Sequence, residues 1–148
     1  MDIQSFLSLD CTACAVPVTS KKRLLELISQ IAAQKLTDLT EQDILEALMH
    51  RERLGSTGIG NGIALPHGRL SNSTQTVAVL ITAENAINFD AIDNQPVNVF
   101  FALLVPEAEC KAHLKSLAAV AEKLSDKTIL KRIRTAQTNQ ELYQIITE

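Results

Sequence analysis

Two apolar segments rich in β-branched residues restrict the fold of this chain more than any other feature. Residues 76–82 and 97–105 have the length and composition of strands, and Pro96 and Pro106 bound the second segment. Residues 90–95, between the two segments, carry turn-forming side chains. Because polar residues are scarce in both segments, we predict that they are buried strands.

Amphipathic segments lie on both sides of these strands in the sequence. Ser20 precedes a segment in which leucine, isoleucine and alanine recur at helical spacing, and Thr40 begins a motif that resembles a capping box. Gly55 ends the second segment. The predicted helices span residues 20–33, residues 40 to about 53, a stretch from about 110 onward, and a final stretch from 138. The pattern predicts an α/β fold: a single-domain sandwich with a small mixed β-sheet flanked by helices.

Length and charge exclude several classes of protein. A chain of 148 residues has the usual size of one domain, so we expect residues 1–148 to fold as a unit. The net charge is −3 and the basic residues are scattered, which argues against a nucleic-acid partner. The longest apolar run, residues 99–105, is far too short to span a bilayer, and no export signal is visible. We therefore expect a cytoplasmic protein that does not insert into a membrane.

Three cysteines leave a metal-binding or redox hypothesis open. Cys11 and Cys14 form a C-x-x-C motif, and with Cys110 and a histidine they could supply four zinc ligands. The odd number and the absence of a second ligand pair make free, reduced thiols the better interpretation. We therefore expect no metal site.

A glycine-rich segment, residues 55–62, carries the strongest chemical signal. Glycines at this density indicate a backbone that bends sharply or approaches another group closely, and a phosphate is one candidate for that group. The segment matches neither a Walker loop nor a dinucleotide-binding motif, so we expect no nucleotide cofactor. Ser56 and Thr57 could bind a phosphoryl group or close a turn. Residues 63–67 are predicted to be extended, at a strand end or sheet edge, because of Pro66.

His67 is the best candidate for a nucleophile. A neutral imidazole can attack phosphorus with one nitrogen while a carbonyl or carboxylate holds the proton on the other. Pro66 stiffens the chain before His67 and Gly68 removes a side chain after it, so we predict an imidazole with little steric cover. The competing interpretation is a simple turn with a surface histidine, and the residues alone do not decide between the two.

Three other side chains are candidates for stabilising a phosphoryl group. Arg51 or Arg53, near the end of the second predicted helix, could return to the glycine-rich segment and bind phosphate oxygens. His113 lies in the predicted first turn of the helix after Cys110, where an anion is favoured. Each of these residues could equally be an ordinary surface residue, and His50 is best interpreted in that way.

One motif resembles that of a known family. Glu52, six intervening residues and then the sequence IGNGIALPHG at residues 59–68 resemble the phosphorylation-site signature of fructose/mannitol-class enzyme IIA domains of the bacterial phosphotransferase system. The resemblance extends through the whole chain, and it is strongest to the nitrogen-regulatory branch of the family.

The resemblance implies a function for the candidate residues. It implies a mixed-sheet α/β domain in which His67 is phosphorylated at Nε2 by a small histidine-phosphorylated (HPr-like) carrier protein. Arg51 and His113 match the supporting arginine and second histidine of the family, and the cysteines have no part in its chemistry. No cofactor or metal is implied. Regulated partners in this branch include potassium transporters and sensor kinases; the alternative is a sugar-specific enzyme IIA that passes the phosphoryl group to an enzyme IIB.

Overall fold

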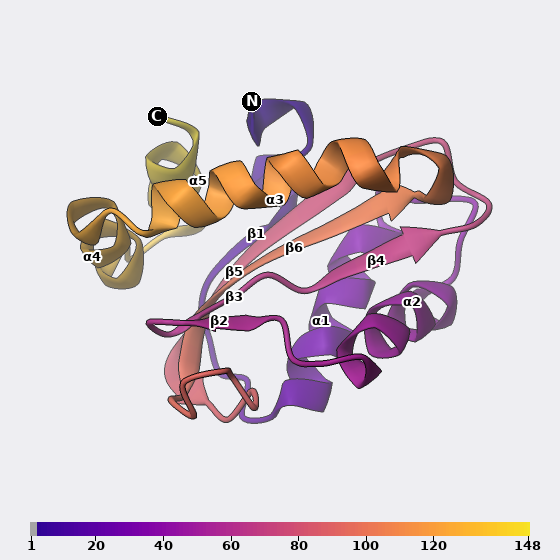
Figure 1. Cartoon of the computed structure of the whole chain (residues 1–148). Helices are drawn as coiled ribbons and strands as arrows, with labels where there is room; N and C mark the ends of the chain where they lie inside the picture. Colours follow the sequence, from indigo (N-terminus) through magenta and orange to yellow (C-terminus); the bar gives the residue numbers. More distant parts are fainter. Residues whose placement is uncertain (1–2) are drawn as a thin grey trace.

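The computed structural model describes residues 3–148 (Figure 1), and Met1 and Asp2 lie outside the described range. The strands are β1 (Thr12–Val16), β2 (Gly58–Gly60), β3 (Ile63–Ala64), β4 (His67–Leu70), β5 (Val77–Ile87) and β6 (Val97–Pro106). The α-helices are α1 (Lys21–Ala33), α2 (Glu41–Arg53), α3 (Cys110–Leu124), α4 (Lys127–Thr135) and α5 (Asn139–Thr147). Short 3₁₀ helices cover Ile3–Ser5, Leu9–Cys11 and Glu107–Glu109.

The six strands form one mixed sheet with β5 and β6 at its centre. The order is β1-β5-β6-β3-β2, and β4 follows β3 along the same side of β6. β5 and β6 are antiparallel, whereas β1 runs parallel to β5, and β3 and β4 run parallel to β6. The predicted fold class is therefore confirmed: this is an α/β sandwich with a mixed sheet.

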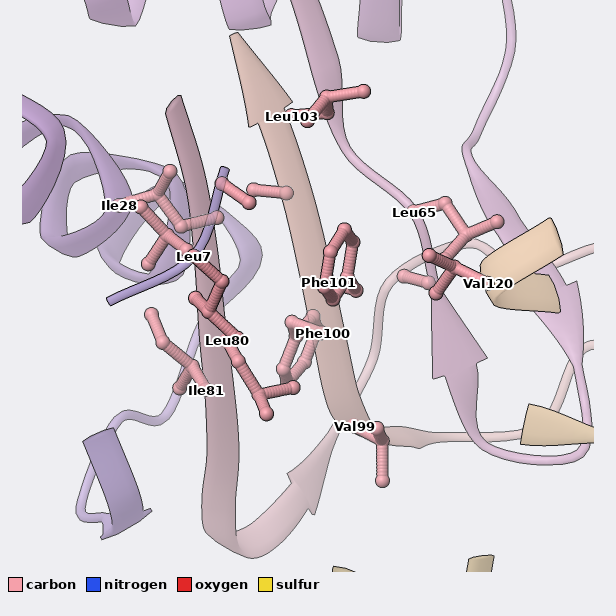
Figure 2. Packing of buried hydrophobic residues seen from close by; sticks show 14 of the residues in the cluster. Leu7, Ile28, Leu65, Leu80, Ile81, Val99, Phe100, Phe101, Leu103 and Val120 are labelled. Atoms are coloured by element: carbon pink, nitrogen blue, oxygen red, sulfur yellow. The ribbon is translucent and has the colours of Figure 1, made fainter. Parts of the chain in front are cut away.

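Helices cover both faces of the sheet. α1 and α2 pack together on one face, and α3 crosses the opposite face (Figure 1). The core consists mainly of side chains from β5 and β6, such as Leu80 and Phe101, which are at most 1% exposed (Figure 2). Each large apolar side chain buried in this way contributes about 1.5–3 kcal/mol to folding. The two predicted strands therefore supply the centre of the core.

The predicted helix starts are present as side-chain caps. Ser20 accepts a hydrogen bond from the backbone N–H of Arg23, and Thr40 and Asp43 form a complete capping box. Thr138 caps α5 in the same way. Such caps stabilise a helix by about 1 kcal/mol each, which explains why these helix starts could be read from the sequence.

Several elements differ from the sequence prediction, which did not include β2 and ended the first central strand at residue 82, whereas β5 continues to Ile87. β1 contains Cys14 of the C-x-x-C motif, whereas Cys11 ends the preceding 3₁₀ helix. The short, alanine- and cysteine-containing sequence of β1 gave no strand signal. The helical stretch after 110 is two helices, because Asp126 ends one run and caps α4 with bonds from the N–H groups of Thr128 and Ile129. Within residues 3–148, no helix is long and apolar enough to cross a membrane.

Candidate functional site

His67 is the first residue of the edge strand β4. The strand lies parallel to β6 with His67 opposite Leu103, and a bond from the Leu103 N–H to the Pro66 carbonyl anchors its start. The predicted extended segment is therefore present, with a break between β3 and β4. The imidazole, however, is half-buried and begins a strand, so the predicted lack of steric cover is wrong. Pairing with β6 draws the histidine into the sheet instead of leaving it in an exposed turn.

Hydrogen bonds at both ring nitrogens fix the tautomer of His67. Nδ1 lies 3.0 Å from the carbonyl oxygen of Leu65, which can only accept, so the ring proton must be on Nδ1. The Nε–H of Arg51 points at Nε2 over 3.2 Å, which requires a lone pair on Nε2. Both contacts select the same neutral tautomer, in which Nε2 is the nucleophilic nitrogen.

Burial lowers the pKa of His67 below its usual value, because desolvation disfavours the charged ring. The Leu65 carbonyl raises the pKa, the charge of Arg51 lowers it, Glu52 raises it and Arg69 lowers it, in decreasing order of effect. Because the net direction is downward, His67 is mainly neutral at physiological pH and its Nε2 lone pair is available.

Of the two candidate arginines, the structure brings Arg51 to the histidine. Arg51 lies in the last turn of α2, and its Nη1 donates to the Gly55 carbonyl over 2.8 Å while its Nε reaches His67. Arg53 is exposed on the same helix end. One arginine therefore links the imidazole to the start of the glycine-rich segment.

Close packing of α2 on β4 explains why Gly68 follows the histidine. A Cβ atom on Gly68 would lie 3.0 Å from the Ala47 Cβ and 3.1 Å from its carbonyl carbon, closer than ordinary contact. Similarly, a Cβ on Gly58 would meet Ala91. These glycines approach protein atoms, so the phosphate candidate is not needed to explain them.

The hydroxyls of Ser56 and Thr57 anchor the glycine-rich segment to the protein. Ser56 Oγ donates to the carbonyl of Phe89 over 2.8 Å, and Thr57 Oγ1 donates to the carboxylate of Glu52. Of the two interpretations left open by the sequence, loop closure is the one that these contacts match. Glu52 also accepts from the Thr57 N–H and pairs with Lys21. The sequence gave no sign of this network, although Glu52 belongs to the motif.

His113, in the first turn of α3, contacts residues other than His67 and Arg51. Its Nε2 lies 3.1 Å from Thr76 Oγ1 and 3.7 Å from Glu109, and its ring packs edge-on against Phe6. Its Nδ1 is buried without a hydrogen-bond partner. In the part of the chain that the structure describes, no hydrogen bond joins His113 to His67 or Arg51. The structure thus joins Arg51 to His67 by a hydrogen bond, whereas His113 bonds to Thr76.

The three cysteines are free thiols in different settings. Cys11 is buried, which raises the pKa of its thiol. Cys14 is half-buried and donates to the Ala136 carbonyl, and Cys110 begins α3. Among the described residues 3–148, no group of three or more histidine, cysteine or acidic side chains is placed to hold a metal ion.

Comparison with known proteins identifies the family. Residues 5–148 match the family described as "Phosphoenolpyruvate-dependent sugar phosphotransferase system, EIIA 2". The chain therefore belongs to the EIIA type-2 family of the phosphotransferase system, a family of phosphoryl-transfer proteins that interact with phosphocarrier proteins.

Its similar relatives include several nitrogen regulatory proteins. The chain is 52% identical over 149 residues to the nitrogen regulatory protein of Escherichia coli K12, covering all of this chain and 91% of that protein. Its structure is similar to that of the nitrogen regulatory protein IIA-Ntr from Neisseria meningitidis, with a TM-score of 0.92, 37% identity, and coverage of 98% and 99% of the two chains. Mannitol IIA from Escherichia coli shares the fold, with a TM-score of 0.78, 15% identity, and coverage of 94% and 97%.

Proposed function

We propose that this chain is a phosphoryl carrier and regulatory protein of the nitrogen-related phosphotransferase system. It acts in the cytoplasm as a single domain over residues 1–148 and accepts a phosphoryl group on Nε2 of His67 from a histidine-phosphorylated, HPr-like carrier. The observation that supports this most strongly is the tautomer of His67: its proton is on Nδ1, bonded to the Leu65 carbonyl, so Nε2 has the lone pair.

Phosphoryl transfer between two imidazoles balances without a metal or nucleotide. The bond between phosphorus and the donor nitrogen breaks and leaves its electron pair on the donor, while the Nε2 lone pair of His67 forms the new bond. The proton on Nδ1 stays in place, so the phosphorylated ring is positively charged and is stabilised by the Leu65 carbonyl. The transition state is loose, so alignment and charge stabilisation supply most of the catalysis.

Arg51 has a different partner before and after transfer in this mechanism. Its Nε–H occupies the Nε2 lone pair in the structure, so the guanidinium must turn from Nε2 before the phosphorus arrives. A short rotation brings its donors to the phosphoryl oxygens, where a planar guanidinium can make two parallel bonds. Arg51 therefore both restrains the nucleophile and stabilises the transferred group.

His113 is the second supporting residue in the proposal. Its side chain must leave Thr76 to donate to a phosphoryl oxygen. Gly68 faces α2. Because successive residues of an extended chain alternate between the two faces of a sheet, His67 lies on the other face, which is the one that α3 covers. The unpartnered Nδ1 lowers the cost of that rotation, because it has no hydrogen bond to lose.

In the proposed regulatory role, the chain acts by binding other proteins. The phosphorylation state of His67 then determines which partner proteins the chain binds, such as potassium transporters or sensor kinases. The similarity to nitrogen regulatory proteins along the full chain supports this role over a sugar-specific one.

The central test is phosphorylation with purified components. The chain should become phosphorylated in the presence of phosphoenolpyruvate, the phosphoenolpyruvate-dependent kinase and the small carrier. The phosphoryl label should be lost in acid and stable in alkali. His67→Ala should abolish it, whereas His50→Ala, a control at an exposed helix position, should be labelled normally. Full labelling of His67→Ala would refute the assignment.

Two further variants separate acceptance from donation. Arg51→Ala should slow acceptance, and His113→Ala should accept the phosphoryl group but pass it on poorly. Unchanged rates in both variants would remove their supporting roles. Rapid transfer from the phosphorylated chain to a sugar-specific IIB domain would favour the sugar-transport alternative over regulation.

A further inference from the structure

A buried carboxylate lies beneath the glycine-rich segment and is not used by the phosphoryl-transfer mechanism. The side chain of Glu52 is only 5% exposed, although α2 begins and ends in solvent. It accepts from the Thr57 N–H at 3.2–3.3 Å and from the Thr57 hydroxyl, and Lys21 of α1 lies 2.9 Å from Oε1. A buried carboxylate needs such partners, and here two of the three donors, the N–H and the hydroxyl, belong to one residue, Thr57.

Thr57 is connected to the histidine through two hydrogen bonds, one between backbone groups and one from the His67 side chain to a backbone carbonyl. The Thr57 carbonyl accepts from the N–H of Leu65 over 3.0 Å. The Leu65 carbonyl in turn accepts from Nδ1–H of His67 over 3.0 Å. A continuous path therefore runs from Glu52 through Thr57 and Leu65 to the ring of His67.

The position of Leu65 makes this path important. Leu65 lies between β3, which ends at Ala64, and β4, which begins at His67, so it belongs to neither strand. The bond from its N–H to Thr57 fixes the peptide group between Ala64 and Leu65, at a point where the ladder with β6 is interrupted. The carbonyl that accepts from His67 lies in the next peptide group, one Cα further on, so its direction depends on φ and ψ of Leu65. If Thr57 moved, the Leu65 carbonyl would turn and the preference for a proton on Nδ1 would weaken.

We propose that Glu52 is a positioning residue that maintains the Nδ1–H tautomer of His67, acting through Thr57 and Leu65. This inference rests on the proposed function of His67, because the tautomer matters only if Nε2 is the nucleophile. Glu52 touches neither the ring nor the transferred group. Lys21 assists by pairing with the carboxylate and packing 4.6 Å above the Phe89 ring.

The direct readout is the tautomer of unphosphorylated His67, measured from imidazole ¹⁵N chemical shifts at alkaline pH, where the ring is neutral. Because this measurement requires no phosphoryl donor, its result is independent of the proposed function. Glu52→Gln keeps the shape but replaces one acceptor oxygen with a donor. We expect the ratio of Nδ1–H to Nε2–H to fall about fivefold, the equivalent of one neutral hydrogen bond. Glu46→Gln, an exposed position on the same helix, is the matched control and should leave the ratio unchanged.

Arg51 also favours this tautomer, so its effect must be removed separately. In Arg51→Ala the ratio should stay high because the Leu65 carbonyl remains, and adding Glu52→Gln should lower it further than either change alone. The phosphoryl-acceptance rate at saturating donor should fall in Glu52→Gln, with the half-saturating donor concentration unchanged.

The outcomes separate positioning from simple anchoring of the loop. A folded Glu52→Gln variant with an unchanged tautomer ratio would overturn the proposal, even if labelling is slower. If Glu52→Gln fails to fold, Thr57→Val is the second variant, because it removes only the hydroxyl bond and keeps the N–H bond. A roughly twofold fall in the ratio supports the proposal, and no change refutes it. A failure of His67 to be phosphorylated in the wild-type chain would instead contradict the proposed function.

Discussion

Replacing Gly68 with alanine tests whether close packing of α2 on β4 keeps Arg51 at the histidine. The new Cβ would lie 3.0 Å from the Ala47 Cβ and 3.1 Å from its carbonyl carbon, whereas carbon atoms pack best at about 3.5–4.0 Å. The helix must therefore move outward by a few tenths of an ångström. Because Arg51 lies one turn after Ala47 on α2, its Nε would move with the helix.

The structure sets the size of both effects. The Nε to Nε2 distance is already 3.2 Å, at the long end of the usual range, so an outward shift of that size weakens this hydrogen bond. Overpacking of this kind costs about 1–3 kcal/mol, which for a chain of this size lowers the melting temperature by about 2–12 °C. We expect Gly68→Ala to melt earlier and to accept the phosphoryl group more slowly than the wild type.

A double-mutant cycle identifies the contact responsible. Ala47→Gly removes the opposing Cβ at a helix-propensity cost of about 0.5–1 kcal/mol. The double variant should be less destabilised than the sum of the two single changes, by about 0.5–3 kcal/mol, as measured by thermal and urea denaturation. The rescue is partial because the Ala47 carbonyl group stays close. Strict additivity, or a Gly68→Ala variant with wild-type stability and acceptance rate, would refute this reasoning.

Two further predictions concern pH and the turn before β3. The folded pKa of His67 lies below its ordinary value of 6.5, so the unfolded state binds the proton more readily; stability should fall as the pH drops through about 6.5 toward the folded pKa. Urea denaturation at several pH values across this window should show that the free energy of unfolding of His67→Gln depends less on pH than that of the wild type. An equal pH dependence in the two proteins would contradict the burial effect. Gly62 has φ +77° and lies against Arg134, so Gly62→Ala should cost about 1–2 kcal/mol of backbone strain plus displacement of that arginine. In an Arg134→Met background, Gly62→Ala should lower the free energy of unfolding only by the backbone strain, as measured by urea denaturation. An equal loss of stability in both backgrounds would argue against the contact with Arg134.

The features of the fold that the sequence predicted correctly depend on local signals. The two central strands are mainly apolar and rich in β-branched residues, and the helix starts carry capping side chains that bond within the same turn. β1 lacked such a signal, because its five residues become a strand only by pairing with β5. The division between α3 and α4 was missed because apolar residues recur at helical spacing on both sides of Asp126, so the pattern hides the break.

The sequence could identify a residue of the site from the motif, but it could not predict the contacts that the residue makes in the fold. His67 could be identified from its neighbours and from the family signature, but its partial burial follows from pairing with Leu103, which is distant in sequence. Whether Arg51 or Arg53 reaches the ring depends on the rotation of α2 against β4, which no local pattern specifies. The contacts of His113 are likewise tertiary, with Thr76 on the chain leading into β5.

The two nitrogens of His67 are controlled by different parts of the chain, which explains why the motif is long. Nδ1 is held by a carbonyl two residues earlier, a contact that the extended stretch before β4 makes available locally. Nε2 is held by α2, sixteen residues earlier, and that contact exists only because Gly68 lets the helix approach the strand. Loss of the first contact would change which nitrogen carries the lone pair, whereas loss of the second would change the pKa of the ring and the positive charge beside it. Residues 51–68 must therefore fold together with the rest of α2 and with β6 before His67 acquires the properties that the proposed phosphoryl transfer requires.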